Sequence, residues 1–373
     1  MKALSMLIYE ANLDNFPYDI LSYNGMLYDN IQPKKKGNGQ MKYIKVEKLE
    51  EGMTVAITLY GNNANVLLTA NNKLTKTSIN RLKLLGFKGI YIYDKNNETY
   101  SSLLSDSTRK KALTNLNHMN IDGCLYVANQ ITNELINNKD MVFDLLSISS
   151  FDNATFNHSI NVAITSTMVG VVLGFDNDTL KLVSQAALLH DLGKTAIDPA
   201  IINKEGDLTD EEFEIVKNHP WYGFNILQHH PSVPAVVRAA VYSHHENEDG
   251  TGYPRGVTGN KIHIIAKIIH VCDVYDALVS KRSYKSTMNP ADAFEYILSY
   301  TGTKFDTDIV NAFQRCIAFY PIGVDVILST EETATVTKNH KNFPARPTVI
   351  TESGKSINLM EQLNVTIIDI IEE

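Results

Sequence analysis

The first part of the chain alternates short apolar runs with turn residues. The runs YIKVEKL, TVAITLY and NVLLTA are rich in β-branched and aromatic residues, so they predict strands. The run TSINRLKLL then places apolar side chains on one face of a helix over residues 77–85, which Gly86 ends, and GIYIYD predicts one more strand. Residues 41–105 are therefore expected to form a small α+β domain with a regulatory or interaction role, after an N-terminal extension over residues 1–40.

The middle of the chain has a helical period instead, and polar groups interrupt its apolar faces. His158 continues the apolar face of one predicted helix, His190 that of the next, and Asp273 that of a third. Thr209 to Glu212 is a capping box, and it predicts a helix that runs as far as His219. Four predicted helices thus each bring one polar group to a buried side.

Beyond Tyr320 the pattern returns to short strands, in the runs GVDVILS, ATVTK, PTVI and NVTIIDII. We therefore expect a mainly α protein. Its all-helical catalytic domain covers residues 106–319, and it is flanked by the small N-terminal α+β domain and by a short β-rich C-terminal segment over residues 320–373.

Composition limits the class of protein and its partners. The 373 residues suffice for two or three domains with cores of their own. The net charge of -8, from 34 Lys and Arg against 42 Asp and Glu, leaves no basic surface to bind a long nucleic acid by counterion release. An anionic ligand must therefore be met by a few local cations.

The cysteines and the N-terminus indicate the compartment. Cys124, Cys272 and Cys316 are odd in number and lie in separate segments, which argues against a disulfide framework and favours a reducing compartment. The first apolar stretch is too short and too acidic for a signal peptide, and no run of eighteen apolar residues occurs. We expect a cytoplasmic protein that does not contact a membrane.

Seven polar side chains in the helical part are candidates for one metal centre. Each taken alone has an ordinary structural alternative, such as a core histidine bonded to a carbonyl, but burying an unpaired His or Asp costs several kcal/mol, roughly. Imidazole and carboxylate without thiolate are ligands for iron, manganese, zinc or nickel, and seven of them suit two ions. The candidates are His158, His190, Asp191, His219, His244, His245 and Asp273.

The order of these residues resembles a known family. The chain reads HS at 158, HDLGK at 190–194, HP at 219, HHENEDGTGYP at 244–254, and an Asp at 273. This series resembles the HD-GYP family, a branch of the HD phosphohydrolases, over roughly residues 145–320. The eleven-residue GYP run is its most specific part.

The resemblance implies an activity and a cofactor. Members are all-helical enzymes that commonly use iron or manganese and hydrolyse cyclic di-GMP to linear pGpG or to GMP. By resemblance, the first metal would be bound by His158, His190, Asp191 and Asp273, with Asp191 as the bridge. His219, His244 and His245 would complete the second site. Two metals bridged by a carboxylate can share a water and convert it to a hydroxide that attacks the phosphorus.

One position departs from the pattern of some members. Where they carry a glutamate that supplies a third metal site, this chain has Ala154, and a methyl group cannot coordinate a cation. The sequence therefore predicts two divalent metals.

Four residues are candidates for contacting the substrate. Lys194 can reach the scissile phosphate, and its alternative role is that of a lysine at a helix end. Arg282 and Lys285 match the phosphate-contacting Arg-x-x-Lys of the family, although composition alone would make them surface charges. Tyr253 of the GYP run either lies near a bound base or phosphate or stabilises its own loop.

The same run contains residues that can shape the loop. Gly250 and Gly252 allow positive φ and a close backbone approach. Glu246 and Asp249 are carboxylates of the kind that orient ligand imidazoles from behind.

The expected function is metal-dependent hydrolysis of a cyclic dinucleotide, with Asp191 and Lys194 as catalytic residues. Cyclic di-GMP is the first substrate, and the 3′,3′ hybrid cyclic GMP-AMP is the near alternative. A second class remains open, namely a non-catalytic sensor or scaffold that binds the nucleotide or a diguanylate cyclase. The complete ligand set favours the enzyme, and homodimerisation is left open.

Overall fold

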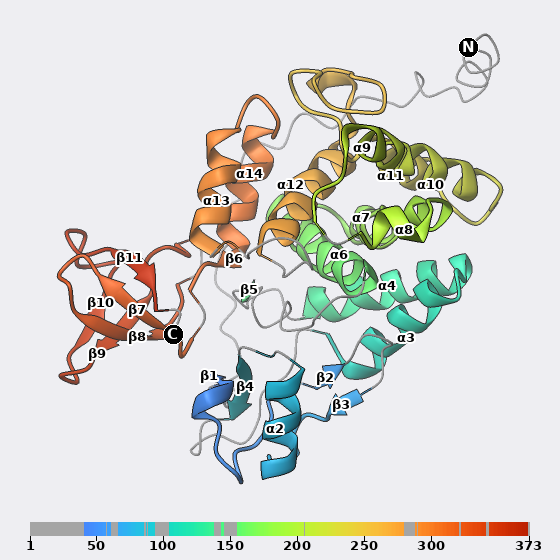
Figure 1. Cartoon of the computed structure of the whole chain (residues 1–373). Coiled ribbons are helices and arrows are strands. Elements are labelled where there is room, and N and C mark those ends of the chain that lie inside the picture. Colours follow the sequence, from blue (N-terminus) through green and yellow to red (C-terminus); the bar gives the residue numbers. More distant parts are fainter. Residues whose placement is uncertain are drawn as a thin grey trace. The chain divides into compact units, whose positions relative to one another are not determined.

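The computed structural model describes most of the chain from Met41 onward (Figure 1). The described residues are 41–56, 58–60, 66–85, 87, 89–93, 104–137, 143–144, 155–204, 206–279, 288, 290–320, 322–340 and 343–371. The predicted N-terminal extension lies outside them.

The N-terminal part contains strands and one helix, but YIKVEKL is a strand only as far as Lys45, and only Leu59–Tyr60 of TVAITLY lies in a strand. β1 pairs antiparallel with β4, and β2 pairs antiparallel with β3. The helix begins at a capping box in which Thr75 and Ser78 each bond the other's backbone N–H. The bounds are β1 (Met41–Lys45), the 3-10 helix η1 (Val46–Lys48), β2 (Leu59–Tyr60), β3 (Val66–Leu68), α2 (Lys76–Leu84) and β4 (Gly89–Tyr93).

Helices dominate the described residues from Asp106 to Cys316, which confirms the mainly α fold class. α6 lies at the centre of this part, because it packs against α4, α7, α12 and α14. The α-helices are α3 (Asp106–Asn117), α4 (Ile121–Asn137), α6 (Thr155–Val172), α7 (Asn177–Leu189), α8 (Pro199–Ile202), α9 (Asp210–Val216), α10 (His219–Gln228), α11 (Ala235–Ser243), α12 (Ile264–Val279), α13 (Pro290–Ser299) and α14 (Thr307–Cys316). The 3-10 helices are η2 (Leu192–Ala196) and η3 (Gly259–Lys261).

The helix predicted to run to His219 ends earlier. The capping box at Thr209 is present, but α9 stops at Val216 and His219 opens α10. Pro220 explains the break, because it has no N–H to donate to the carbonyl four residues earlier and its ring clashes with that carbonyl. The same proline fits the first turn of α10.

The C-terminal strands form one antiparallel sheet in the order β10-β9-β8-β7-β11. They are β7 (Asp325–Leu328), β8 (Thr333–Lys338), β9 (Thr348–Thr351), β10 (Ser356–Asn358) and β11 (Ile367–Ile370), and a separate parallel pair joins β5 (Phe143–Asp144) to β6 (Ile317–Ala318). The β-rich segment is therefore confirmed, and the short strand β10 is an addition to the prediction.

Two further expectations concern the described residues. Cys124, Cys272 and Cys316 are free and buried, as their spacing indicates. Among the helices that the structure describes, none has the length and apolar character needed to cross a bilayer.

Candidate metal centre

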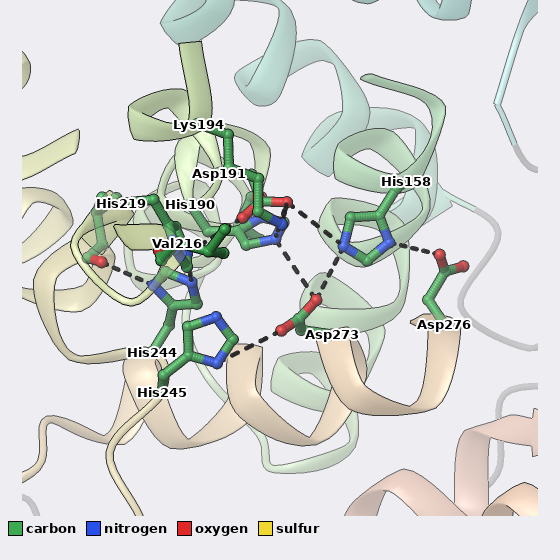
Figure 2. Close-up of polar contacts among 12 residues, drawn as sticks. His158, His190, Asp191, Lys194, Val216, His219, His244, His245, Asp273 and Asp276 are labelled. Atoms are coloured by element: carbon green, nitrogen blue, oxygen red, sulfur yellow. Dashed lines mark hydrogen bonds and ion pairs between the residues drawn. The ribbon is translucent and has the colours of Figure 1, made fainter. Parts of the chain in front are cut away.

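The structure brings the seven predicted metal ligands into one cluster (Figure 2). They come from segments far apart in the sequence. His158 lies in α6, His190 and Asp191 follow the end of α7, His219 opens α10, His244 and His245 follow α11, and Asp273 lies in α12. The helix packing, and not sequence proximity, therefore assembles this cluster.

One half of the cluster lies between α6, α7 and α12. His158 Nε2 is 2.8 Å from Asp273 Oδ1, and His190 Nε2 is 3.7 Å from the same oxygen. Ligand atoms of these three residues lie within 4.8 Å of one another, which is close enough to bind a single ion.

The other half is a group of three imidazoles. His219 Nε2 is 3.2 Å from His244 Nε2, and the ring of His245 is 4.2 Å from that of His244. His219, His244 and His245 also offer ligand atoms within 4.8 Å of one another.

Asp191 lies between the two halves. Its Oδ1 is 3.4 Å from Nε2 of His219, in the group of three imidazoles. Its Oδ2 is 3.5 Å from His190 Nε2 and 3.8 Å from His158 Nε2, in the other half. This carboxylate therefore presents one oxygen to each half, which is the arrangement that a bridging ligand needs.

Backbone carbonyls at helix ends orient three of the imidazoles. Each ring donates its Nδ1–H to the carbonyl three residues earlier, in the last turn of a helix, where carbonyls lack a helical partner. The pairs are His190 with Ala187 at 2.7 Å, His219 with Val216 at 2.8 Å, and His244 with Val241 at 2.7 Å. A carbonyl only accepts, so the proton is on Nδ1 and the Nε2 lone pair faces the cluster.

The carboxylate of Asp276, which is outside the predicted set, orients the ring of His158 through Nδ1. Asp276 Oδ2 is 2.6 Å from His158 Nδ1, and Asn161 Nδ2 donates to the other oxygen of Asp276 at 3.2 Å. Sequence reasoning missed Asp276. The available signal was its position three residues after Asp273 in the run CDVYDAL, on the same side of one helix.

Unpaired ligand atoms show that the residues fit divalent metal ions. His190 Nε2 and Asp191 Oδ1 are buried and have no hydrogen-bond partner. The lone pairs of His219 and His244 face each other at 3.2 Å, an arrangement that repels unless a positive charge lies near both. Divalent cations satisfy all four atoms at once, and imidazole with carboxylate suits first-row metals.

The proton affinities of the two halves differ. Burial lowers the pKa of His190, but the carboxylates of Asp191 and Asp273 outweigh this effect and raise it to about 10. Burial lowers the pKa of His219 to about 4, with a further contribution from the charge of Lys194. Burial also holds the pKa of His244 well below its ordinary value. The group of three imidazoles therefore offers neutral rings at neutral pH.

The segment HDLGK at 190–194, called the HD turn, is packed closely against the start of α10. A Cβ on Gly193 would lie 2.0 Å from the carbonyl oxygen of His219 and 2.4 Å from the nitrogen of Gly223. Lys194, the next residue, donates to Asp191 Oδ2 at 2.5 Å and is mostly buried. The lysine therefore contacts the carboxylate that lies between the two halves.

The GYP loop, residues 244–254, folds back so that Tyr253 contacts His245. The ring of Tyr253 stacks on the ring of His245 with centroids 4.7 Å apart. The backbone N–H of Tyr253 donates to the backbone carbonyl of His245. Gly250 has a φ of +80°, as the loop requires, and Gly252 has the close backbone contacts that exclude a side chain. Tyr253 thus lies against a candidate ligand and also stabilises its own loop.

The predicted role of Glu246 and Asp249 was wrong. Glu246 is buried and accepts from the backbone N–H groups of Arg255 and Val257, whereas Asp249 accepts from Thr251. Their hydrogen bonds are made within the loop itself. The imidazoles take backbone carbonyls instead.

Three predicted positions lie outside the described residues. They are Arg282 and Lys285, expected to contact phosphate, and Ala154, where a third metal ligand was expected to be absent.

The chain is similar to known proteins over this region. Residues 137–309 match the model of the HD domain. A cyclic di-GMP phosphodiesterase of Pseudomonas aeruginosa is 33% identical over 60% of this chain and 54% of its own length. The 3′3′-cGAMP-specific phosphodiesterase 3 of Vibrio cholerae is 33% identical over 45% of this chain and 36% of its own length. The first of these matches thus spans about half of its relative.

Among solved structures, the chain is similar to Bd1817, an HDG"Y"P protein from Bdellovibrio bacteriovorus. The TM-score is 0.48 at 18% identity, and the match covers 74% of this chain and 98% of that one.

Proposed function

This chain belongs to the HD-domain proteins, with the domain over residues 137–309, and on that premise we propose that it is a metal-dependent phosphodiesterase of cyclic dinucleotides. Cyclic di-GMP is the proposed substrate, and linear pGpG or GMP is the product. The observation that carries the proposal is the position of Asp191, whose two oxygens face two adjoining groups of candidate ligands.

The two groups suggest how two ions would be held. His158, His190 and Asp273 would bind one, His219, His244 and His245 the other, and Asp191 would contact both. We expect iron or manganese in these sites. When bound, the ions supply a nucleophilic water at neutral pH and stabilise the negative charge that builds on the phosphate.

Protein side chains supply the remaining functions. The Nδ1 hydrogen bonds hold the ligand imidazoles with Nε2 turned toward the proposed ion sites. Lys194 is within 2.5 Å of Asp191, so its ammonium lies next to the place where a phosphate oxygen would approach. Tyr253, together with Arg282 and Lys285, is proposed to contact the nucleotide.

The hybrid cyclic GMP-AMP is the second candidate substrate. It is favoured by the similarity to the Vibrio cholerae enzyme that is specific for 3′3′-cGAMP. A non-catalytic nucleotide sensor is less well supported, because such a module has no need for a complete set of metal ligands.

The decisive experiment is an anaerobic assay of protein loaded with Fe²⁺ or Mn²⁺. Cyclic di-GMP, the hybrid dinucleotide and a simple phosphodiester are compared, and the products are separated by chromatography. We expect turnover of a cyclic dinucleotide, two tightly held ions per chain, and loss of at least about a hundredfold in rate in Asp191→Ala.

The matched control is Asp178→Ala, which removes an exposed carboxylate paired with Lys181. The control is expected to keep full activity, and both variants to keep the far-UV circular dichroism of the parent. Wild-type turnover in Asp191→Ala would remove this residue from the mechanism, and three tight ions per chain would contradict the binuclear site.

A further inference from the structure

The GYP loop is attached to α12 at a point away from the candidate ligands. Lys267, in the second turn of α12, lies 3.0 Å from Glu248 Oε1 and 3.0 Å from Asp306 Oδ2. All three side chains are partly buried. Glu248 belongs to the run HHENEDGTGYP, so this lysine links the loop that carries His244 and His245 to the helix that carries Asp273.

The carboxylate partners of Lys267 have fixed positions of their own. Asp306 caps α14, since its Oδ1 accepts from the N–H groups of Asp308 and Ile309 at 2.9 and 3.2 Å, and its Oδ2 is left for the lysine. The backbone N–H of Glu248 donates to the Lys304 carbonyl at 3.3 Å. The lysine is therefore held between a helix cap and a loop whose backbone is bonded to the segment just before that cap.

A second contact from α12 reaches the same loop one turn further on. The ring centroid of His270 is 6.3 Å from that of His245, in an edge-on arrangement. Lys267, His270 and Asp273 follow one another at intervals of three residues, so they lie along one side of α12. One side of this helix thus contacts the loop twice and then supplies a candidate ligand.

Charge makes Lys267 necessary to this arrangement. Partial burial lowers the pKa of Lys267, but its hydrogen bonds to Glu248 and Asp306 outweigh burial and raise it, so the ammonium stays charged. Without that charge, two carboxylates would be left close together in a half-buried place and would repel each other. The Glu248 side chain is expected to respond more than that of Asp306, because the Asp306 carboxylate also caps α14.

We propose that Lys267 is a positioning residue of the metal centre, which holds the GYP loop through Glu248 so that His244 and His245 stay in register with Asp273. Nothing in this role requires Lys267 to touch metal or substrate. The inference rests on the proposed binuclear site, but it is tested by metal binding and does not depend on which phosphodiester is hydrolysed.

The experiment titrates the full-length protein with Co²⁺ and records the d–d absorption, which reports the ligand geometry. Lys267→Met removes the charge and keeps most of the length of the side chain. We expect Co²⁺ binding to weaken about tenfold, as when other partners that support metal ligands are removed, with a changed d–d spectrum. Lys267→Arg is expected to restore most of the affinity, because it keeps the charge between the two carboxylates.

The matched control is Lys181→Met, which removes a lysine paired with Asp178 on the surface of α7. It is expected to bind Co²⁺ as the parent does. A merely structural role for Lys267 predicts a lower thermal midpoint in the metal-free protein with an unchanged Co²⁺ spectrum and affinity. That result would overturn the proposal.

Glu248→Gln covers the case in which Lys267→Met does not fold. The amide still accepts from Lys267 but loses the charge, while Asp306 keeps its pairing. We expect the same spectral change in smaller measure, and unchanged Co²⁺ binding in this variant would also overturn the proposal. If Co²⁺ binding responds as expected and no cyclic dinucleotide is cleaved, the proposed function fails while the positioning role stands.

Discussion

At the scale of single residues, the group that accepts the Nδ1–H of each histidine decides which ring nitrogen can bind a metal. A neutral imidazole has one donor and one acceptor nitrogen, and a hydrogen bond from Nδ1 leaves Nε2 as the acceptor. His190, His219 and His244 each give this proton to a backbone carbonyl, and His158 faces the Asp276 carboxylate. Four candidate ligands thus present Nε2 to the same place.

Replacing the carboxylate behind His158 tests this reading. Asp276→Asn keeps the volume but weakens the acceptor for His158 Nδ1, so we expect metal affinity to fall roughly tenfold. Bound Mn²⁺ is measured by electron paramagnetic resonance during a titration. Asp122→Asn, which changes an exposed carboxylate bonded to Ser232, is the control and is expected to have no effect. Equal affinities in the two variants would argue against an orienting role.

The raised pKa values predict that metal binding releases protons. In the metal-free protein, burial lowers the pKa of His158, but the hydrogen bonds to Asp273 and Asp276 outweigh it and raise it. The pKa of His190 is raised to about 10 by Asp191 and Asp273 against burial. A cation must displace these protons at pH 7, so metal affinity is expected to rise as pH rises from 6 to 8. Calorimetry in buffers of different ionisation enthalpy counts the protons, and the absence of any release would contradict the prediction.

The same pKa shifts predict how the stability of the metal-free fold changes with pH. Since the pKa of His190 is raised above its ordinary 6.5, its contribution is fully present below pH 6.5 and is lost as pH rises through about 10.

At the scale of secondary-structure elements, the ends of helices build the site. α7, α9 and α11 each stop just before a candidate ligand, and the carbonyls left unpaired in their last turns become its hydrogen-bond acceptors. Pro220 contributes to this, since it cannot use the carbonyl of Val216 and His219 Nδ1 takes it instead.

The contact between the HD turn and α10 leads to a prediction about Gly193. A Cβ there would lie 2.0 Å from backbone oxygen, which cannot move without shifting His219, so Gly193→Ala is expected to destabilise the fold by about 1–3 kcal/mol and to weaken metal binding. Urea unfolding measures the first effect.

Gly170→Ala is the control for Gly193→Ala. The added methyl would meet the flexible end of Leu180 at 2.7 Å, and alanine favours the helix by up to about 1 kcal/mol, so little net change is expected. Similar losses of stability in the two variants would mean that the close backbone contact of Gly193 does not cause the loss.

At the scale of the whole molecule, the candidate ligands join helices from distant parts of the chain. α6, α10 and α12 each supply one, and the residues that follow α7 and α11 supply the others. Ions that bind only the folded chain stabilise it, by about 2.7 kcal/mol when free metal is a hundred times the dissociation constant. Chelation is therefore expected to lower the midpoint of thermal unfolding.

The control for this prediction is Asp191→Ala, whose unfolding midpoint is expected to depend little on added Mn²⁺. Thermal scans are recorded with chelator and with excess Mn²⁺. An unfolding midpoint of the parent protein that does not change between the two would contradict the prediction.

Much of the fold and of the cluster could be predicted from local patterns. The helical period placed His158, His190 and Asp273 on buried faces, and the strand runs appear where β-branched residues dominate, because both signals arise within a few neighbouring residues. The helix that begins at Thr209 was predicted to end at His219, before Pro220, but α9 ends at Val216 and the proline lies in the first turn of α10.

The sequence by itself determined which side chains can bind metal, their order, and the type of most elements, because ligand chemistry and periodicity are properties of short segments. The tertiary structure alone decided which partner each polar group takes. Asp276 meets His158 across 118 residues, and Lys267 meets Glu248 across 19. Such pairs depend on how helices pack, and Glu246 turned to loop N–H groups for the same reason: a buried carboxylate takes the nearest donors that the fold provides.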